Sequence, residues 1–241
     1  MKTLLAILVF FVSISRATIS EIANASNTGT STGPTITHGL TILANDVLIA
    51  LVHVDIDQRV ADNNGGTPFT EDWDVIGGDT NGYAIYSRRA GGGEPASYSW
   101  TIGSSARWSI GLRQFRGVIT SGSVYDLAPA APAKSTGISI TATVPSITTL
   151  TRGALAVAWV VTDGNVITYS APTNGYAQEL EPAANQQQAS YTKTIATAGA
   201  TGTVAITLSA SDDWSTQHFA LKQAVAAGGA AGIINNPLVF R

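Results

Sequence analysis

The sequence predicts an all-β protein, an antiparallel β-sandwich of jelly-roll or concanavalin-like type that is built from two related halves. Three features support this prediction. Apolar and polar residues alternate along most of the chain, clusters of turn-forming residues separate the alternating stretches, and one series of residues recurs in the second half. The 241 residues are enough for one large sandwich or for two small ones.

The alternation identifies the strands. Residues 97–102 (SYSWTI) place Tyr98, Trp100 and Ile102 on one face, as expected of a strand with one side against a core. Residues 46–55 (DVLIALVHVD) are apolar at nearly every position, which indicates a strand covered on both faces. The expected turns, rich in Gly, Pro, Asn and Asp, are residues 62–68, 77–82, 91–95 and 171–175.

An internal repeat relates residues 31–117 to residues 135–223. Its recurring residues are Ser31-Thr32-Gly33 with Ser135-Thr136-Gly137, Pro68 with Pro172, Ala90 with Ala196, Gly93 with Gly199, and Trp108 with Trp214. Each half therefore predicts the same series of strands, ending on one that contains tryptophan. We expect Trp108 and Trp214 to occupy equivalent core positions in one larger sandwich at 34–223, with the link at 118–134 lying across its surface. Two tandem sandwiches are the alternative.

The two ends of the chain differ from the middle. Residues 1–17 have the pattern of a signal peptide, a retained hydrophobic arm being the alternative, and their apolar run is too short to span a membrane. Residues 18–33 are rich in Ser, Thr and Asn and predict a flexible lead-in. Residues 224–241 predict an Ala/Gly linker followed by an apolar segment at 233–240. We expect that segment to dock on a sheet edge of its own chain or, in a homo-oligomer, of another.

Composition and charge exclude several classes of function. Charged residues make up 12% of the chain and the formal net charge is −3, so the basic character of a nucleic-acid-binding protein is missing. The absence of cysteine excludes disulfide bonds, thiolate catalysis and cysteine-ligated zinc. The abundance of Gly, Ala, Ser and Thr is typical of secreted or virion β-proteins. We therefore expect a secreted or cell-surface protein, or alternatively a virion component, with no organic cofactor and no nucleic-acid partner.

Four segments carry a resemblance to a known kind of module. They are DVLIALV (46–52), RRAGGGEPASYSWT (88–101), WSIGLRQFRGV (108–118) and WSTQHFALK (214–222). Together they resemble a β-sandwich module that is common in phage structural proteins and in secreted bacterial proteins. The resemblance covers about residues 31–224. It implies a virion-associated or cell-surface sandwich of the adhesin or carbohydrate-binding kind, and it brings no catalytic residues.

Acidic residues concentrate between residues 46 and 79, where eight carboxylates meet a single arginine. One interpretation is a calcium site, because calcium prefers clustered carboxylate and amide oxygens from loops. Its ligands would be Asp55, Asp57, Asp62 and Asn64, although their spacing matches no EF-hand loop. The other interpretation is solvated loop charge, paired in part with the basic segment that follows.

That basic segment contains five arginines and no lysine: Arg88, Arg89, Arg107, Arg113 and Arg116. Arginine favours fixed bidentate pairs, so we expect most of these side chains to meet carboxylates from residues 46–79. The alternative is a site for a polyanion or a sialic-acid-like glycan, with Arg88 and Arg89 as ligand-binding residues. Trp73 and Tyr176 are the candidates for sugar stacking, because both follow turn-rich segments at places that the repeat presents as equivalent.

Enzymatic activity finds little support in the sequence. The stretch GTSTG in the lead-in matches the G-x-S-x-G nucleophile pattern, but that motif must join a strand to a helix. A glycosidase would need opposed carboxylates, for instance Glu71 with Asp74 or Glu94, and a lyase would rely on Arg88 and Tyr86. We expect a non-enzymatic surface or virion-associated module that serves attachment, by glycan binding or self-assembly. The alternative is a secreted polysaccharide-active hydrolase or lyase of sandwich fold.

Overall fold

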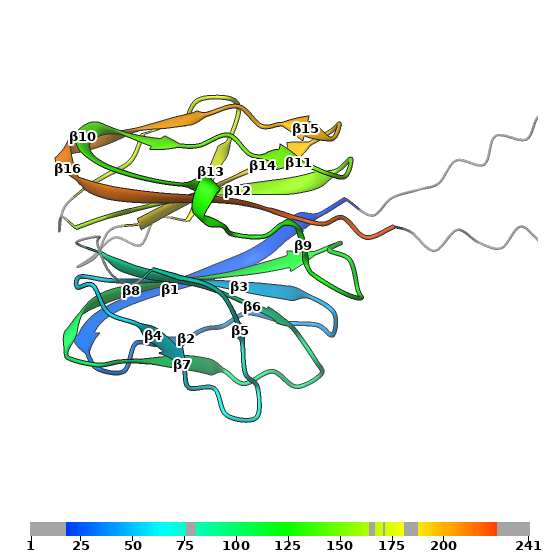
Figure 1. The fold of residues 1–241 in the computed structure, drawn as a ribbon. Coiled ribbons are helices and arrows are strands. Elements are labelled where there is room, and N and C mark those ends of the chain that lie inside the picture. The colour runs from blue at the N-terminus through cyan, green and yellow to red at the C-terminus, as the bar shows by residue number, and fades with distance from the viewer. Residues whose placement is uncertain (1–17, 76–80, 164–166, 171, 181–187, 226–241) are drawn as a thin grey trace, which may run out of the picture.

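The computed structural model describes residues 18–75, 81–163, 167–170, 172–180 and 188–225 (Figure 1). They form antiparallel sheets packed in two stacked halves, which confirms the all-β sandwich built from two related halves. The predicted signal peptide at 1–17 and the predicted docking segment at 233–240 lie outside the described residues. Within the described ranges there is no helix of the length and apolarity that crossing a membrane requires.

The N-terminal repeat (residues 18–117) contains a five-stranded sheet and a three-stranded sheet. The five-stranded sheet has the order β1 (Ser20–Ser31), β8 (Ala106–Arg116), β3 (Val47–Val54), β6 (Gly82–Arg89) and β5 (Thr70–Val75). The three-stranded sheet has the order β2 (Thr35–Thr37), β7 (Ser97–Ile102) and β4 (Val60–Asp62). Every residue of β3 is buried, as the unbroken apolar run predicts for a strand covered on both faces.

The C-terminal repeat (residues 134–225) repeats this strand order. Its main sheet has the order β10 (Lys134–Val144), β16 (Val204–Leu221), β12 (Ala154–Thr162), β14 (Gln188–Ile195) and β13 (Ala177–Leu180). A short pair, β11 (Thr148–Thr149) and β15 (Gly199–Ala200), completes the repeat. The single strand β10 takes the place of β1 and β2 of the N-terminal repeat, and the single strand β16 takes the place of β7 and β8.

The two tryptophans of the repeat occupy equivalent positions, as predicted. Trp108 pairs with Gly29 across the β1–β8 ladder and Trp214 pairs with Gly137 across the β10–β16 ladder. Both glycines leave room for the indole, because a Cβ added to Gly29 or Gly137 would lie only 2.5 or 2.6 Å from the ring atom Cζ2. Each indole N–H donates to a serine two residues past the glycine, at 3.0 Å to Ser31 Oγ and 3.1 Å to Ser139 Oγ.

This geometry corrects two expectations. Ser31 corresponds to Ser139 and not to Ser135, so the recurring Ser-Thr-Gly triplet does not mark the structural register. The lead-in at 18–33 is not a flexible segment, because β1 takes up most of it and pairs with β8 over its whole length. Its small polar residues suit an edge strand, and Gly29 is needed where the Trp108 ring lies over the backbone.

Three buried clusters hold the layers together. One lies between the two sheets of the N-terminal repeat and includes Leu48 and Trp100, and a second occupies the same place in the C-terminal repeat. The third joins the two large sheets face to face, with Ile49 of β3 and Val157 and Trp159 of β12 among its members (Figure 1). Each repeat is therefore a small sandwich, which is the tandem arrangement that the sequence left as the alternative to one larger sandwich. The apolar faces of the two large sheets pack against each other and join the two repeats.

The link between the repeats does not lie across the surface of the sandwich, in contrast to the prediction. It forms β9 (Tyr125–Leu127), which pairs with β16, and a 3-10 turn, η1 (Ala131–Ala133). Tyr125 is buried in the cluster between the large sheets, where its ring meets that of Phe219 edge to face at 5.7 Å. The link thereby brings Tyr125 next to β5 of the N-terminal repeat.

Candidate functional site

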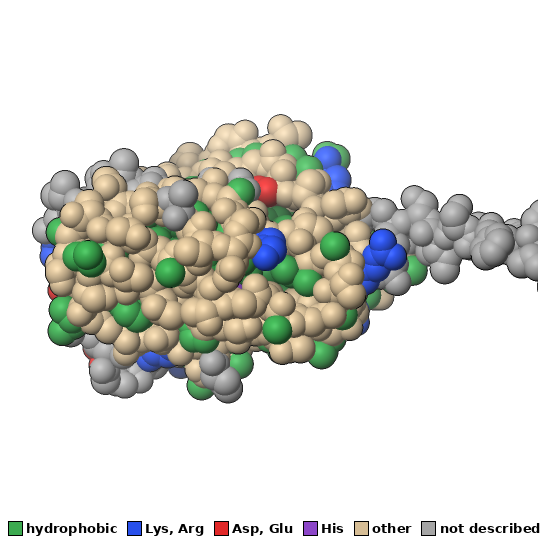
Figure 2. All heavy atoms as spheres, turned by 90° about the horizontal axis from the view of Figure 1, so that it is seen from above, with side chains coloured by type: hydrophobic (Ala, Val, Ile, Leu, Met, Phe, Trp, Pro, Cys, Tyr) green, Lys and Arg blue, Asp and Glu red, His purple; other side chains and the backbone are tan. Residues whose placement is uncertain are grey.

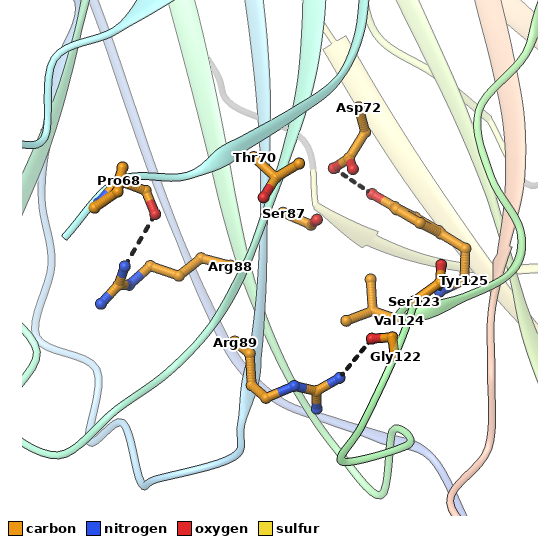
Figure 3. Close-up of a pocket in the computed structure, with 10 residues that line it drawn as sticks. All are labelled: Pro68, Thr70, Asp72, Ser87, Arg88, Arg89, Gly122, Ser123, Val124 and Tyr125. Carbon is orange, nitrogen blue, oxygen red and sulfur yellow. Dashed lines mark hydrogen bonds between the residues drawn. The ribbon is translucent and has the colours of Figure 1, made fainter.

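A polar pocket of about 340 Å³ opens beside β5 and β6, where the link approaches the N-terminal repeat (Figure 3). Its walls come from three segments: Pro68, Thr70 and Asp72 before and in β5, Ser87 to Arg89 at the end of β6, and Gly122 to Tyr125 in the link. This volume lies at the small end of ligand pockets in proteins. Its lining is unusually polar for such a pocket, which points to a ligand that forms hydrogen bonds.

A bulge in β5 gives Asp72 its place in the pocket. Glu71 pairs with Tyr86 and Trp73 pairs with Ile85, so Asp72 is the extra residue between two regular pairs. Bulges often redirect a side chain in this way at edge strands and beside sites. The redirected carboxylate accepts a hydrogen bond from the Tyr125 hydroxyl at 2.7 Å (Figure 3).

The Asp72 carboxyl has an unusual pKa. Burial raises the pKa of Asp72 to about 6, and hydrogen bonds from Tyr125 and Ser87 only partly oppose this effect. No cation within the described ranges forms an ion pair with Asp72. A carboxyl with this pKa changes its charge close to neutral pH.

Arg89 supplies the positive charge of the pocket. Its Nη2 reaches the Gly122 carbonyl oxygen at 3.5 Å, a long hydrogen bond, and its buried Nη1 has no partner within the described part of the chain. Burial lowers the pKa of Arg89. Arginine stays protonated at neutral pH, so the pocket contains a cation whose charge no described carboxylate neutralises.

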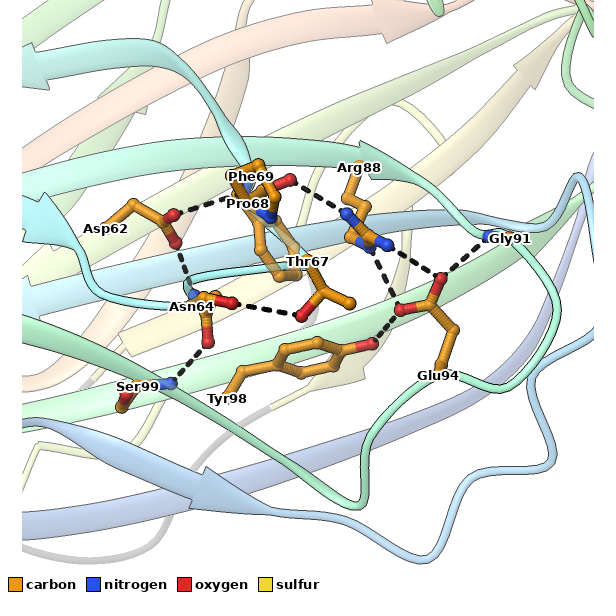
Figure 4. Close-up of polar contacts among 10 residues, drawn as sticks. All are labelled: Asp62, Asn64, Thr67, Pro68, Phe69, Arg88, Gly91, Glu94, Tyr98 and Ser99. Atoms are coloured by element: carbon orange, nitrogen blue, oxygen red, sulfur yellow. Dashed lines mark hydrogen bonds and ion pairs between the residues drawn. The ribbon is translucent and has the colours of Figure 1, made fainter.

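Arg88, its neighbour, is fully engaged (Figure 4). Its Nε and Nη2 donate to the two oxygens of Glu94 at 2.9 and 3.0 Å, and its Nη1 donates to the Pro68 carbonyl oxygen. Glu94 also accepts from Gly91 N–H and from the Tyr98 hydroxyl. Although burial acts in the opposite direction, these bonds lower the pKa of Glu94. Arg88 therefore ties two loops together and is not free to bind an anion.

The other arginines follow the expected pattern only in part. Arg107 pairs with Asp55 and Arg116 pairs with Asp46, both acids of the predicted 46–79 stretch. Arg113 pairs instead with Glu21 on β1, and Arg88 pairs with Glu94. Within the described part of the chain, two of the five arginines meet acids of the 46–79 stretch, so the expected majority is not found there. The sequence does not predict the pairing with Glu21, because the composition of residues 18–33 favours a flexible lead-in over a strand.

The four residues suggested for calcium do not form one site. Asp55 accepts from Arg107 Nε at 2.6 Å, whereas Asp62 accepts from the Asn64 side chain and the Phe69 amide. The Asn64 side-chain oxygen accepts from the Ser99 amide (Figure 4). Asp57 is exposed on the loop after β3. The described residues contain no group of three or more His, Asp or Glu side chains that could hold a metal ion.

Trp73 and Tyr176, the candidates for sugar stacking, contribute to cores. Trp73 packs against the cluster between the large sheets, and Tyr176 is 5% exposed with its hydroxyl 2.8 Å from His218 Nε2. They are not equivalent in the repeat. The ladders align Tyr176 with Phe69, immediately before β13 and β5, and align Trp73 with Leu180.

The residues considered for catalysis are also engaged elsewhere. Glu71 and Asp74 both lie beside Arg59, and the Asp74 side chain is only 6% exposed. Tyr86 is buried and donates to the Val60 carbonyl oxygen at 2.6 Å, and burial raises its pKa, so it is a poor proton acceptor. Neither a glycosidase pair nor the Arg88–Tyr86 pair lines the pocket beside β5 and β6.

Sequence reasoning named Arg89 but missed Asp72 and Tyr125. Asp72 was one of eight acids with nothing to distinguish it, and Tyr125 lies in a link that was expected on the surface. Comparisons of the chain with protein-family models, with curated proteins and with solved structures found no match.

Proposed function

We propose that this protein is a non-enzymatic attachment module that binds a glycan in the pocket beside β5 and β6. The observation that carries the proposal is the Arg89 guanidinium, which lines a polar pocket without a described carboxylate partner. Hydroxyl groups of Thr70, Ser87 and Ser123 line the same pocket. Sugars are bound through such convergent polar groups, and the cost of burying the Arg89 charge favours a ligand that offers it an acceptor.

Affinity electrophoresis in gels that contain a neutral or an acidic polysaccharide tests the proposal, with dextran and polygalacturonate as probes. We expect retardation of the wild-type protein, and loss of it in Arg89→Gln. Arg59→Gln is the matched control, because it removes the same charge from an exposed ion pair outside the pocket. Release of reducing or unsaturated ends from the same polysaccharides would contradict a non-enzymatic role. If neither polysaccharide retards the protein, the proposal fails.

Self-assembly through β10 is a second candidate, because this edge strand exposes two large apolar side chains. Ile138 is 75% exposed and Ile140 is 56% exposed, and between Ser135 and Val144 the strand contains no charged residue. Figure 2 looks onto the C-terminal repeat and shows mainly uncharged side chains and backbone there. Edge strands without charge tend to pair with other edges. Sedimentation of Ile138→Lys beside the wild type tests this candidate, which fails if the wild type remains a monomer at high concentration.

A further inference from the structure

Two charged groups that have no ion-pair partner among the described residues face the same pocket from different walls. Figure 3 shows Asp72, with Ser87 near it, on one side and the Arg89 guanidinium on the other. Arg88, the second cation of the lining, is neutralised by Glu94. Tyr125 is the remaining titratable group, and its hydroxyl is bound to Asp72. The pocket therefore offers one cationic end and one end whose charge depends on a proton.

We propose that the pocket binds a uronic-acid residue, with Arg89 binding the sugar carboxylate and Asp72 weakening the complex as the pH rises. This inference rests on the proposed glycan binding and names the ligand class and the pH dependence of that site. A guanidinium and a carboxylate match in a planar, two-point geometry, and the Arg89 guanidinium lines the pocket without a carboxylate partner among the described residues. A single cation suits a monoanion better than a dianionic phosphate, whose second charge nothing in the lining would neutralise.

The far end of the pocket suits the hydroxyl groups of a sugar. Thr70 and Ser87 present hydroxyls that donate or accept, and Asp72 presents a carboxyl. Below about pH 6 the carboxyl is neutral and can donate to a sugar oxygen, in line with the pKa that burial raises to about 6. Above that pH it carries a negative charge in the same pocket as the bound carboxylate. Repulsion between the two then lowers the affinity.

Calorimetric titration with glucuronate, glucose and acetate at pH 5 and pH 8 tests the inference. Glucose removes the carboxylate and acetate removes the sugar hydroxyls, so both should bind more weakly than glucuronate. We expect glucuronate to bind about three- to tenfold more tightly at pH 5 than at pH 8. Arg89→Gln should weaken glucuronate binding by about tenfold or more at both pH values. Arg59→Gln should leave it unchanged.

Asp72→Asn provides the decisive variant. The amide oxygen can still accept from Tyr125, and the side chain stays neutral, so glucuronate should bind with the pH 5 affinity at both pH values. Thermal unfolding of each variant confirms that it is folded. Equal glucuronate affinity at pH 5 and pH 8 in the wild type would overturn the role of Asp72. Equal affinity for glucose and glucuronate would overturn the choice of an acidic sugar. Both results leave glycan binding standing, whereas failure of every saccharide, including the polysaccharides above, ends the proposed function itself.

Discussion

The two repeats share one framework but differ in charge. The N-terminal repeat contains ten acidic and six basic residues, and the C-terminal repeat contains five acidic and four basic ones. Among the described residues, six ion pairs connect strands and loops within the N-terminal repeat. Both repeats nevertheless keep the same indole lying over a glycine and donating to a serine. The strand framework that the repeats share thus depends on core contacts. The charged side chains differ between the repeats, so a charged site can occur in one repeat alone.

The comparison extends to one pair of core positions. In the N-terminal repeat these positions hold Phe69 and Leu112, which are both buried in the core of that repeat. In the C-terminal repeat the corresponding residues are Tyr176 and His218, and they form a hydrogen bond of 2.8 Å. His218 Nδ1 also lies 2.7 Å from the Pro145 carbonyl oxygen. Two apolar residues in one repeat are matched by a hydrogen-bonded polar pair in the other, so the same place in the framework accepts either kind of contact.

Replacing either framework tryptophan should have the largest effect on stability. Trp108→Ala and Trp214→Ala each remove a buried indole and its hydrogen bond to serine, so each should lower the free energy of unfolding by about 3–5 kcal/mol. Denaturant unfolding measures both, with Leu150→Ala as a control because Leu150 is 69% exposed. If replacing one of the tryptophans lowers the free energy of unfolding by less than about 1 kcal/mol, the two positions are not energetically equivalent.

Replacing Tyr176 and His218 by the residue types of the N-terminal repeat should have a smaller effect on the free energy of unfolding. The effects of the two changes should not be additive. His218 donates from Nδ1 to Pro145, so its Nε2 accepts from the Tyr176 hydroxyl. Tyr176→Phe leaves that buried nitrogen without a donor and should cost about 1–3 kcal/mol. His218→Leu leaves the hydroxyl and the Pro145 carbonyl without their partner.

The double variant Tyr176→Phe, His218→Leu reproduces the residue types of the N-terminal repeat. It should cost less than the sum of the two single changes, because no unpaired group remains between the two side chains. A double-mutant cycle, measured by denaturant unfolding, gives the coupling free energy between Tyr176 and His218. Strict additivity would show that the hydrogen bond between Tyr176 and His218 contributes nothing of its own.

The sequence predicted the parts of this fold that depend on local pattern. The buried strand β3 and the alternately buried strand β7 are both found as predicted. The spacing of apolar residues along a strand directly reflects whether one face or both faces are buried. The prediction of a flexible lead-in at 18–33 was wrong for a different reason. Small polar residues are common to flexible segments and to edge strands, and what decides between them here is Trp108, which lies 79 positions after Gly29 in the chain.

The candidate site was predictable only at Arg89. The pairing of Arg88 with Glu94 is nearly local in sequence, since Glu94 is the one acid between Tyr83 and Gly117. Asp72 enters the pocket through a β-bulge, and Tyr125 arrives there because the link pairs with the last strand. Both are consequences of long-range strand pairing, which residue types alone do not specify.

The last prediction concerns the effect of pH at a place where repeat-related carboxyls meet. Asp55 follows β3 and Asp163 follows β12, and their amides donate to the equivalent carbonyl oxygens of Arg107 and Asp213. The two side chains are hydrogen-bonded to each other. This hydrogen bond, together with burial and the nearby charges of Asp55 and Asp212, raises the pKa of Asp163 to about 7, and Arg107 opposes the shift. The unfolded chain loses this proton near pH 4, so stability is lost as the pH rises from about 4 to about 7.

Asp163→Asn isolates this contribution. The amide can still donate to Asp55 but carries no charge, so the variant should gain stability relative to the wild type as the pH rises through this window. Asp57→Asn, an exposed change of the same charge, should show no such trend. Thermal unfolding from pH 4 to pH 8 measures the difference between variant and wild type. The difference also removes the opposite slope from His53 and His218, whose pKa values burial lowers to about 4 and which therefore cost stability as the pH falls below 6.5. A constant difference across the range would mean that the two repeats do not share a proton at this contact.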